Sequence, residues 1–280
     1  WFSESSAPGK FSWRTNAGSV KTITSRPVLA GSLAYSDKEV REYCNGKGPP
    51  VPYRHRIRIS DLIPGTTYQY KVEQRDSQFS ATFRTAPPSG QPIRFIVYAD
   101  SETQPESAGA CVKWTEPGNE GKERKYLIDQ TRGYANNLEV IISRRPDFIG
   151  IAGDLVEIGG AQRHWNEFWR HNSGQNPAKN VAGRIPILPA LGNHEYYDDK
   201  KIWAGYRQPW SENAVVKYLT YFEVPPNNSP NKAQEGRYYR LDYGPISLIV
   251  LDGNNNSPNG SKQDTNFLLM GEGDAGGGDA

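Results

Sequence analysis

Three short apolar segments in the middle of the chain each lead into a polar residue that can bind a metal ion. The segments span residues 93–99, 148–152 and 185–191, and the polar residues after them are Asp100, Asp154 and Asn193. Carboxylate and amide oxygens are hard donors that suit divalent or trivalent cations. If the segments are parallel strands, their carboxyl ends meet at one edge of a sheet, where open α/β sheets bind ligands. The spacing therefore predicts a metal centre at this edge.

The sequence Gly-Asn-His-Glu at residues 192–195 is the most specific of these signals. Asn193 offers a neutral amide oxygen to a metal, and His194 follows directly, so that it can face a substrate. Other uses are open: Asn-His can form a turn before a helix, a Gly-Asp pair such as the one at Asp154 also makes turns, and an Asp such as Asp100 often caps a helix. The order and spacing of all three signals favour the metal site.

Predicted strands and helices alternate around these residues. A helix is predicted for residues 122–144, ending before Pro146, and a short aromatic-rich helix for residues 161–170. Two further strands are predicted for residues 237–242 and 246–252. Strand, helix, strand, helix, strand is the order typical of an α/β layer.

Residues 1–88 follow a different, all-β pattern. Residues 56–59 alternate Arg and Ile, which predicts a strand with both isoleucines on one face. Residues 62–72 resemble the corner between strands E and F of fibronectin type III domains, where a Tyr hydroxyl can bond back to the preceding turn. The Pro-rich residues 85–90 predict a linker.

The bulk composition excludes some partners. The 33 Lys+Arg residues nearly balance the 31 Asp+Glu residues, so the charge gives no case for nucleic acid as a binding partner or for an anionic membrane surface. No apolar run reaches the length of a membrane span. The chain opens on Trp1 without a secretory signal, which we interpret as a mature or trimmed N-terminus. One Met and two Cys suit an extracellular or periplasmic protein, and Cys44 and Cys111 could form a disulfide or two thiols.

The order of the polar segments resembles that of the metallophosphoesterase superfamily, and the β region before them resembles the layout of purple acid phosphatases. The pattern of those enzymes runs Asp, Gly-Asp-x-x-Tyr, Gly-Asn-His-Glu/Asp, a later His, and Gly-His-x-His. Asp100, residues 153–156 and residues 192–195 match the first three segments in turn. The resemblance covers most of residues 93–253.

This resemblance implies an α/β fold class in two parts. Residues 1–88 would form a fibronectin III-like β-sandwich, and residues 93–280 the N-terminal, incomplete half of a metallophosphoesterase α/β sandwich. The later histidines of the family pattern are absent, because the four histidines here are His55, His164, His171 and His194. We expect surface roles for His164 and His171. We also expect that a C-terminal companion chain or a missing C-terminal half completes the sheet and the site.

The implied activity is metal-dependent hydrolysis of a phosphate ester substrate by a phosphatase or phosphodiesterase. Asp154 would bridge two metal ions, with Asp100 on one and Asn193 on the other, and the ions would be Fe, Zn or Mn. The metals would activate a water and clamp the attacking and leaving oxygens. His194 would stabilise the phosphoryl group or protonate the leaving oxygen. The alternative is a non-catalytic phosphate-binding or cell-surface adhesion protein on the same fold.

Two positions depart from the family pattern. The Tyr that binds iron in purple acid phosphatases is replaced by Glu157, so we expect no charge-transfer colour. Other members of the superfamily place a His at the position of Glu102. Glu102 lies close after Asp100, and Glu157 close after Asp154, so either carboxylate could be the replacement metal ligand. Each could equally be an exposed loop residue.

Overall fold

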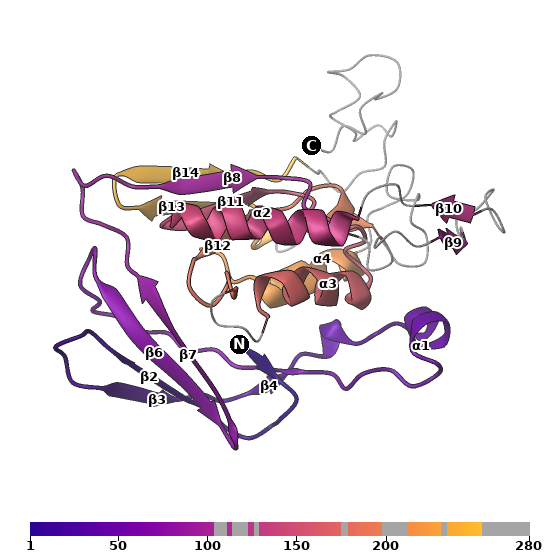
Figure 1. Ribbon diagram of the computed structural model, residues 1–280, viewed down its shortest axis with the longest axis horizontal. Coiled ribbons are helices and arrows are strands. Elements are labelled where there is room, and N and C mark those ends of the chain that lie inside the picture. Colours follow the sequence, from indigo (N-terminus) through magenta and orange to yellow (C-terminus); the bar gives the residue numbers. More distant parts are fainter. Residues whose placement is uncertain are drawn as a thin grey trace, which may run out of the picture.

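The fold was analysed in a computed structural model, which describes residues 1–103, 111–113, 123–125, 129–174, 179–197, 212–230 and 234–253. For residues 111–113, 123–125, 212 and 213 only the backbone is described. Figure 1 shows an N-terminal part made mainly of antiparallel strands, and beside it a part in which helices pack on a parallel sheet. The chain therefore has a mixed α/β fold, as predicted.

The N-terminal part contains two antiparallel sheets. The four-stranded sheet has the order β3-β2-β6-β7, and the three-stranded sheet has the order β1-β5-β4. The strands are β1 (Phe2–Ser3), β2 (Lys10–Arg14), β3 (Lys21–Thr24), β4 (Val28–Leu29), β5 (Tyr53–Arg54), β6 (Thr67–Gln74) and β7 (Ser77–Arg84). The part is not purely β, because a 3-10 turn, η1 (Gly31–Leu33), and a helix, α1 (Asp37–Tyr43), lie between β4 and β5. A capping box between Ser36 and Glu39 starts this helix.

The predicted tyrosine corner is present. Tyr68 is buried, and its hydroxyl oxygen accepts a hydrogen bond from the Ile63 backbone N–H at 2.9 Å. This bond fixes the turn that precedes β6. The assignment of residues 1–88 to a fibronectin III-like sandwich, and the boundary between two domains, stay predictions.

The predicted strand at residues 56–59 is wrong. Strand β5 ends just before this segment, which has no regular structure. The alternation nevertheless matches the burial, because Ile57 and Ile59 are half-buried while Arg56 and Arg58 are exposed. A period of two thus predicted which side chains turn inward, but pairing also requires a neighbouring strand in register.

The second part is built on a parallel sheet with the order β12-β11-β8. Its strands are β8 (Phe95–Tyr98), β11 (Phe148–Ala152) and β12 (Ile187–Ala190). Two antiparallel hairpins accompany it, β9 (Cys111–Lys113) with β10 (Glu123–Lys125), and β13 (Tyr239–Tyr243) with β14 (Ile246–Val250). The central strand β11 is buried from Phe148 to Ile151, as expected for a strand covered on both faces.

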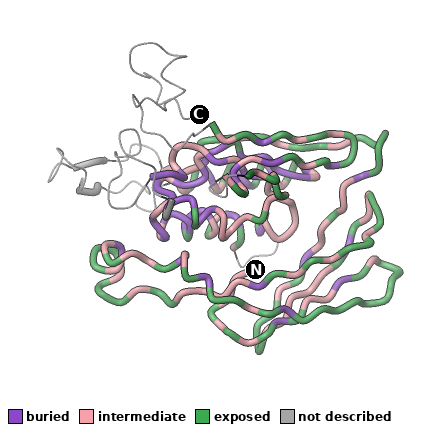
Figure 2. Tube along the Cα trace, turned by 180° about the vertical axis from the view of Figure 1, so that it is seen from behind, coloured by how far each residue is buried: buried purple, intermediate pink, exposed green. Residues whose placement is uncertain are grey.

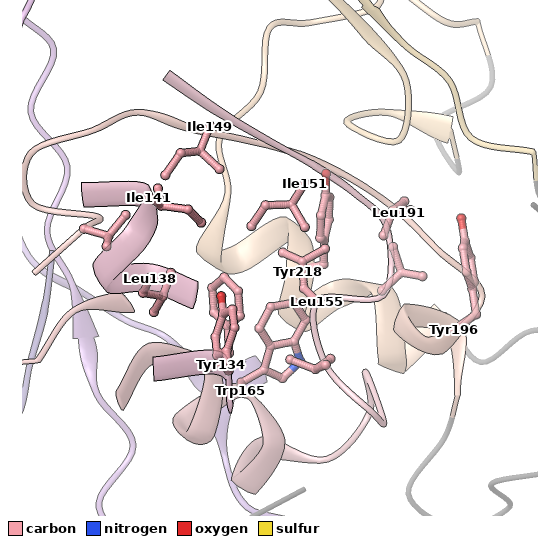
Figure 3. Close-up of a cluster of buried hydrophobic side chains, with 14 residues drawn as sticks. Tyr134, Leu138, Ile141, Ile149, Ile151, Leu155, Trp165, Leu191, Tyr196 and Tyr218 are labelled. Atoms are coloured by element: carbon pink, nitrogen blue, oxygen red, sulfur yellow. The ribbon is translucent and has the colours of Figure 1, made fainter. Parts of the chain in front are cut away.

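Helices α2 (Gln130–Arg144), α3 (Gln162–Asn172) and α4 (Glu212–Tyr221) contribute to the main hydrophobic core with β11. Figure 3 shows Leu138 and Ile141 of α2 beside Ile149 and Ile151 of β11, with Trp165 of α3 on the same side. The spacing of four and three residues between Tyr134, Leu138 and Ile141 puts one face of α2 into this core. Burial of such side chains contributes roughly 1.5–3 kcal/mol each to folding.

Helix α2 starts later than the sequence pattern predicted. The Asp129 side chain caps the helix by accepting the Arg132 N–H at 2.8 Å, so the helix begins at Gln130. Residues 123–125 instead form β10, while residue 122 and residues 126–128 lie outside the described residues. The helix ends as predicted, with Arg145 in the left-handed conformation before Pro146.

Some large apolar side chains of the α/β part are exposed. Phe95 is 45% exposed and Val97 56% on β8, while Ile249 on β14 is 69% and the nearby Leu251 71% exposed. Figure 2 shows that buried residues otherwise gather in this part, whereas the N-terminal sheets are mostly half-buried or exposed. Among the described residues, no helix has the length and apolar character needed to cross a membrane.

Candidate metal centre

The three strand ends predicted to carry the site lie together. The parallel register of β8, β11 and β12 puts their carboxyl ends at one edge of the sheet. Backbone bonds join the loops there: the Asp100 N–H donates to the Gly153 carbonyl at 3.3 Å, and the Ser101 N–H to the Asp154 carbonyl at 3.0 Å. The His194 N–H donates to Asp154 Oδ1 at 3.1 Å. Asp100, Asp154 and Asn193 therefore belong to adjoining loops.

The backbone of these loops is held in conformations that few residues adopt. Asp100 and Asp154 have φ of 52° and 50°, in the left-handed region that costs most non-glycine residues about 1–3 kcal/mol. Glycine at 192 is required because a Cβ there would lie 2.2 Å from Asp154 Oδ1. Strain and close approach of this kind concentrate at functional sites.

Glu195 holds two of the loops in place. Its side chain is fully buried, and its carboxylate accepts four backbone N–H groups. These donors are Asp154 at 3.0 Å, Leu155 at 2.8 Å, Val156 at 3.2 Å and Gly192 at 2.8 Å. Burial and the neighbouring Asp154 charge raise the pKa of Glu195 to about 7, while the N–H bonds favour its ionised form. Glu195 belongs to the Gly-Asn-His-Glu motif, but the sequence alone did not predict this role for it.

Three side chains bring potential ligand atoms closest together. These are Glu102, Glu157 and His194, whose ligand atoms lie within 4.8 Å of one another. All three are half-buried, so neither glutamate is a fully exposed loop residue. Asp100 and Asp154 are outside this closest group, and Asp100 is exposed. The Asn193 amide nitrogen donates to the Tyr197 hydroxyl at 2.8 Å, which leaves the amide oxygen as its metal-binding atom.

The electrostatics of this cluster favour a cation. Burial raises the pKa of Glu102 to about 7, and the negative charges of Asp154 and Glu157 add to that rise. Burial lowers the pKa of His194, but the charges of Asp154 and Glu157 outweigh it and the pKa is raised overall. The carboxylates of Asp154 and Glu157 thus contribute to both shifts, as negative charges that a cation would offset.

His194 has a defined orientation. Its Nδ1 lies 2.9 Å from the Glu157 backbone carbonyl. Since a carbonyl oxygen only accepts, Nδ1 carries the proton, and Nε2 is the nitrogen that can exchange one. Such a carbonyl partner on one ring nitrogen is the usual way that a functional histidine is oriented.

The expectation of surface roles for His164 and His171 is wrong. His164 is 2% exposed, and neither of its ring nitrogens has a hydrogen-bond partner among the described residues. His171 has a buried side chain and bonds Glu167 at 3.0 Å. The amphipathic pattern of α3 could have indicated this, because position 164 falls on the same helical face as the buried Phe168. His55 lies in the N-terminal part, as predicted.

The residues present fit a metal ion. Glu102 Oε2 is buried and has no hydrogen-bond partner among the described residues. A buried carboxylate oxygen in that state is costly unless a cation or a donor compensates it. The carboxylate oxygens around it are donors that Mn²⁺, Fe and Zn²⁺ all accept. Whether Asp100, Asp154, Asn193, Glu102 and Glu157 bind metal stays a prediction.

Comparison with known proteins gives the chain a family. The sequence profile of calcineurin-like phosphoesterases matches residues 126–276, which is more than half of the 280 residues. A purple acid phosphatase from yellow lupin (Lupinus luteus) seeds has a similar fold, with 17% sequence identity and a TM-score of 0.54. The match covers 95% of this chain but only 43% of the lupin chain. No curated protein matches. The chain belongs to the calcineurin-like phosphoesterase family.

Proposed function

We propose that the chain is part of a hydrolase that cleaves phosphate esters at a dinuclear metal centre. The family membership supports phosphoester hydrolysis as the class of reaction. The observation that carries the proposal for these residues is the group of Glu102, Glu157 and His194, with ligand atoms within 4.8 Å at the carboxyl edge of the parallel sheet. Such an edge is where α/β folds bind ligands.

In this proposal each loop has its own task. Asp154 would be shared by the two ions, Asp100 would hold one and Asn193 the other, and Glu102 and Glu157 would supply further oxygen donors. The ions are Fe, Zn or Mn. When bound, they provide a water of lowered pKa and positive charge for the transferring phosphoryl group. The chain itself fixes the loops through Glu195, whose four N–H bonds keep the residue 154 and residue 193 loops at one separation.

His194 is the proton donor in this proposal. Its Nδ1–H is held by the Glu157 carbonyl, so Nε2 is the nitrogen that can give a proton to the leaving oxygen. An acid placed within reach of the leaving oxygen contributes roughly 10²–10⁴-fold to such reactions. The negative charges around the ring favour the protonated form that this role needs.

We further propose that residues beyond this chain complete the centre. Phe95, Val97, Ile249 and Leu251 are exposed apolar side chains that a further part of the domain can cover. A C-terminal half of the same protein, or a companion chain, would bring the histidine ligands of the family pattern. The lupin match supports this, because this chain spans 43% of that structure.

We also propose that residues 1–88 and residues 93–280 form two domains, and that the protein has an extracellular or periplasmic location.

The test compares substitutions of two aspartates, made in the full-length protein that the gene encodes. Asp154→Asn is expected to abolish phosphate release from a p-nitrophenyl mono- or diester and to lower the bound metal measured by mass spectrometry. Asn193→Ala should do the same. The matched control is Asp242→Asn, an exposed aspartate on β13 that bonds Arg240 and Ser247, and it should change neither. Normal hydrolysis by Asp154→Asn or Asn193→Ala contradicts the assignment.

A second candidate function is phosphate binding without catalysis. A cleft of about 580 Å³ on the N-terminal sheet is lined by Lys10, Arg14, Lys71 and Arg184, with Glu73 as the acidic residue. It contains none of the predicted metal ligands, and its excess of cations suits an anion. This reading predicts phosphate binding that Arg14→Gln weakens, no turnover, and no effect of Asp154→Asn.

A further inference from the structure

Glu102 and Glu157 approach each other from different loops. Glu102 follows β8 and Glu157 follows β11, yet their carboxylates belong to one group of atoms within 4.8 Å. Two like charges at that separation in a half-buried site repel each other unless a cation or a shared proton lies between them. The buried Glu102 Oε2 has no hydrogen-bond partner among the described residues. His194 of the same group can offset part of this negative charge, and a bound metal ion can offset the rest.

We propose that Glu102 and Glu157 bind the same metal ion together, and that this pair biases the centre toward Mn²⁺ relative to Zn²⁺. This inference rests on the proposed function, because it assigns the selectivity of that same site. Neither residue alone is the replacement ligand: the two carboxylates act as one pair of donors.

The bias follows from the chemistry of the donors. Anionic carboxylate oxygens are hard donors that suit Mn²⁺, whereas imidazole suits Zn²⁺. Zn²⁺ generally outcompetes Mn²⁺ at mixed sites, so the expected effect is on the ratio of the two affinities and not on their order. Two carboxylates on one ion supply two anionic oxygen donors. Mn²⁺ accepts more oxygen ligands than Zn²⁺ does, so it gains more from this pair. A histidine in place of either glutamate would reverse this effect.

The arrangement of the neighbours keeps the pair directed at one point. The Glu157 backbone carbonyl accepts the His194 Nδ1–H at 2.9 Å, which ties the loop after β11 to the loop after β12. On the other side, the Ser101 N–H bonds the Asp154 carbonyl at 3.0 Å, which ties the residue before Glu102 to the same loop. Both glutamates are thus carried by loops whose separation is fixed by backbone bonds, as a ligand pair requires.

The experiment measures metal binding directly in the protein as its gene encodes it. A chelator first removes bound metal from the protein. Binding of Mn²⁺ is then followed by the loss of the electron paramagnetic resonance signal of free Mn²⁺. Binding of Zn²⁺ is followed by competition with a chromophoric chelator. Glu102→Gln and Glu157→Gln should each weaken Mn²⁺ binding by about 10- to 100-fold. The double variant should lose less than the product of the two single losses, because both residues act on one ion.

A swap and a control complete the design. Glu102→His should shift the Zn²⁺-to-Mn²⁺ affinity ratio toward zinc by about tenfold or more. Glu139→Gln is the matched control, because Glu139 is exposed and pairs with Lys179 on the protein surface. It should leave both affinities unchanged. Near-ultraviolet circular dichroism of each stripped variant checks that the fold is retained.

Two results separate this inference from the proposed function. If Asp154→Asn loses metal and hydrolysis while both Glu→Gln variants bind Mn²⁺ within about twofold of the unaltered protein, the glutamate pair is not a ligand pair and the inference is wrong. If the unaltered protein binds no metal, or if Asp154→Asn hydrolyses normally, the proposed function itself is wrong. If Glu102→His leaves the ratio of the Zn²⁺ and Mn²⁺ affinities unchanged, the proposed bias toward Mn²⁺ is also wrong.

Discussion

The N-terminal β region and the α/β region both bury a histidine, but they surround it differently. His55 is 3% exposed in the first region, and its two ring nitrogens lie 2.8 Å from Ser25 Oγ and 2.9 Å from Ser3 Oγ. His164 is 2% exposed in the second region, and neither nitrogen has a hydrogen-bond partner among the described residues. Both ring nitrogens of the imidazole thus have partners in the first region, whereas in the second region neither has one among the described residues.

Buried carboxylates repeat this contrast. Glu39 of α1 is 2% exposed, and its two oxygens accept the N–H groups of Ser36 at 2.9 Å and Arg163 at 2.8 Å. Glu102 leaves a buried oxygen without a partner among the described residues. Buried polar groups normally find partners. Glu102 therefore differs from Glu39 in keeping an oxygen to which a ligand such as a metal ion can bind.

The largest expected effect concerns His194. His194→Ala should lower kcat by about 10²–10⁴-fold while bound metal is retained, because it removes the proton donor and no ligand. In the metal-free protein the charges of Asp154 and Glu157 raise the pKa of His194 against the opposing effect of burial. Since the protonated form donates, kcat should fall as pH rises through the pKa that His194 has when the metal ions are bound.

The control for this prediction is the other bonded histidine of the region. His171→Ala removes a side chain that bonds Glu167 and is not a member of the Glu102–Glu157–His194 group, and it should leave kcat unchanged. Phosphate release is measured across pH together with metal content. If His194→Ala loses bound metal as well as turnover, His194 is a metal ligand and not the proton donor.

The next effect concerns Glu195, the buried carboxylate of the α/β region that does have its partners. Glu195→Gln keeps the shape of the side chain, but its NH₂ group would face two of the four backbone N–H donors. We expect a loss of about 2–4 kcal/mol in the free energy of unfolding, measured by urea denaturation. Glu42→Gln, at an exposed position of α1, is the control and should change it little. A similar small change at Glu195 would mean that the carboxylate does not hold the loops.

The sequence predicted which loops lie together better than it predicted how the chain supports them. The adjoining positions of Asp100, Asp154 and Asn193 were predicted correctly because parallel strands end at one edge, and that rule does not depend on side-chain detail. The role of Glu195 was missed because its four partners are backbone groups, which a sequence does not reveal. The start of α2 was placed too early because Asp129, a good N-cap, stands inside a longer run of compatible residues.

The smallest expected effects test the two histidines with one substitution. His55→Leu should destabilise the protein by about 2 kcal/mol, because it leaves buried hydroxyl groups of the N-terminal region without their imidazole partner. His164→Leu should instead stabilise the protein by about 1 kcal/mol, because it removes two buried nitrogens that have no partner among the described residues. Both are measured by urea denaturation at pH 7 on metal-free protein. If His164→Leu destabilises as much as His55→Leu, His164 has a partner that the described residues do not include, and the contrast between the regions fails at that position.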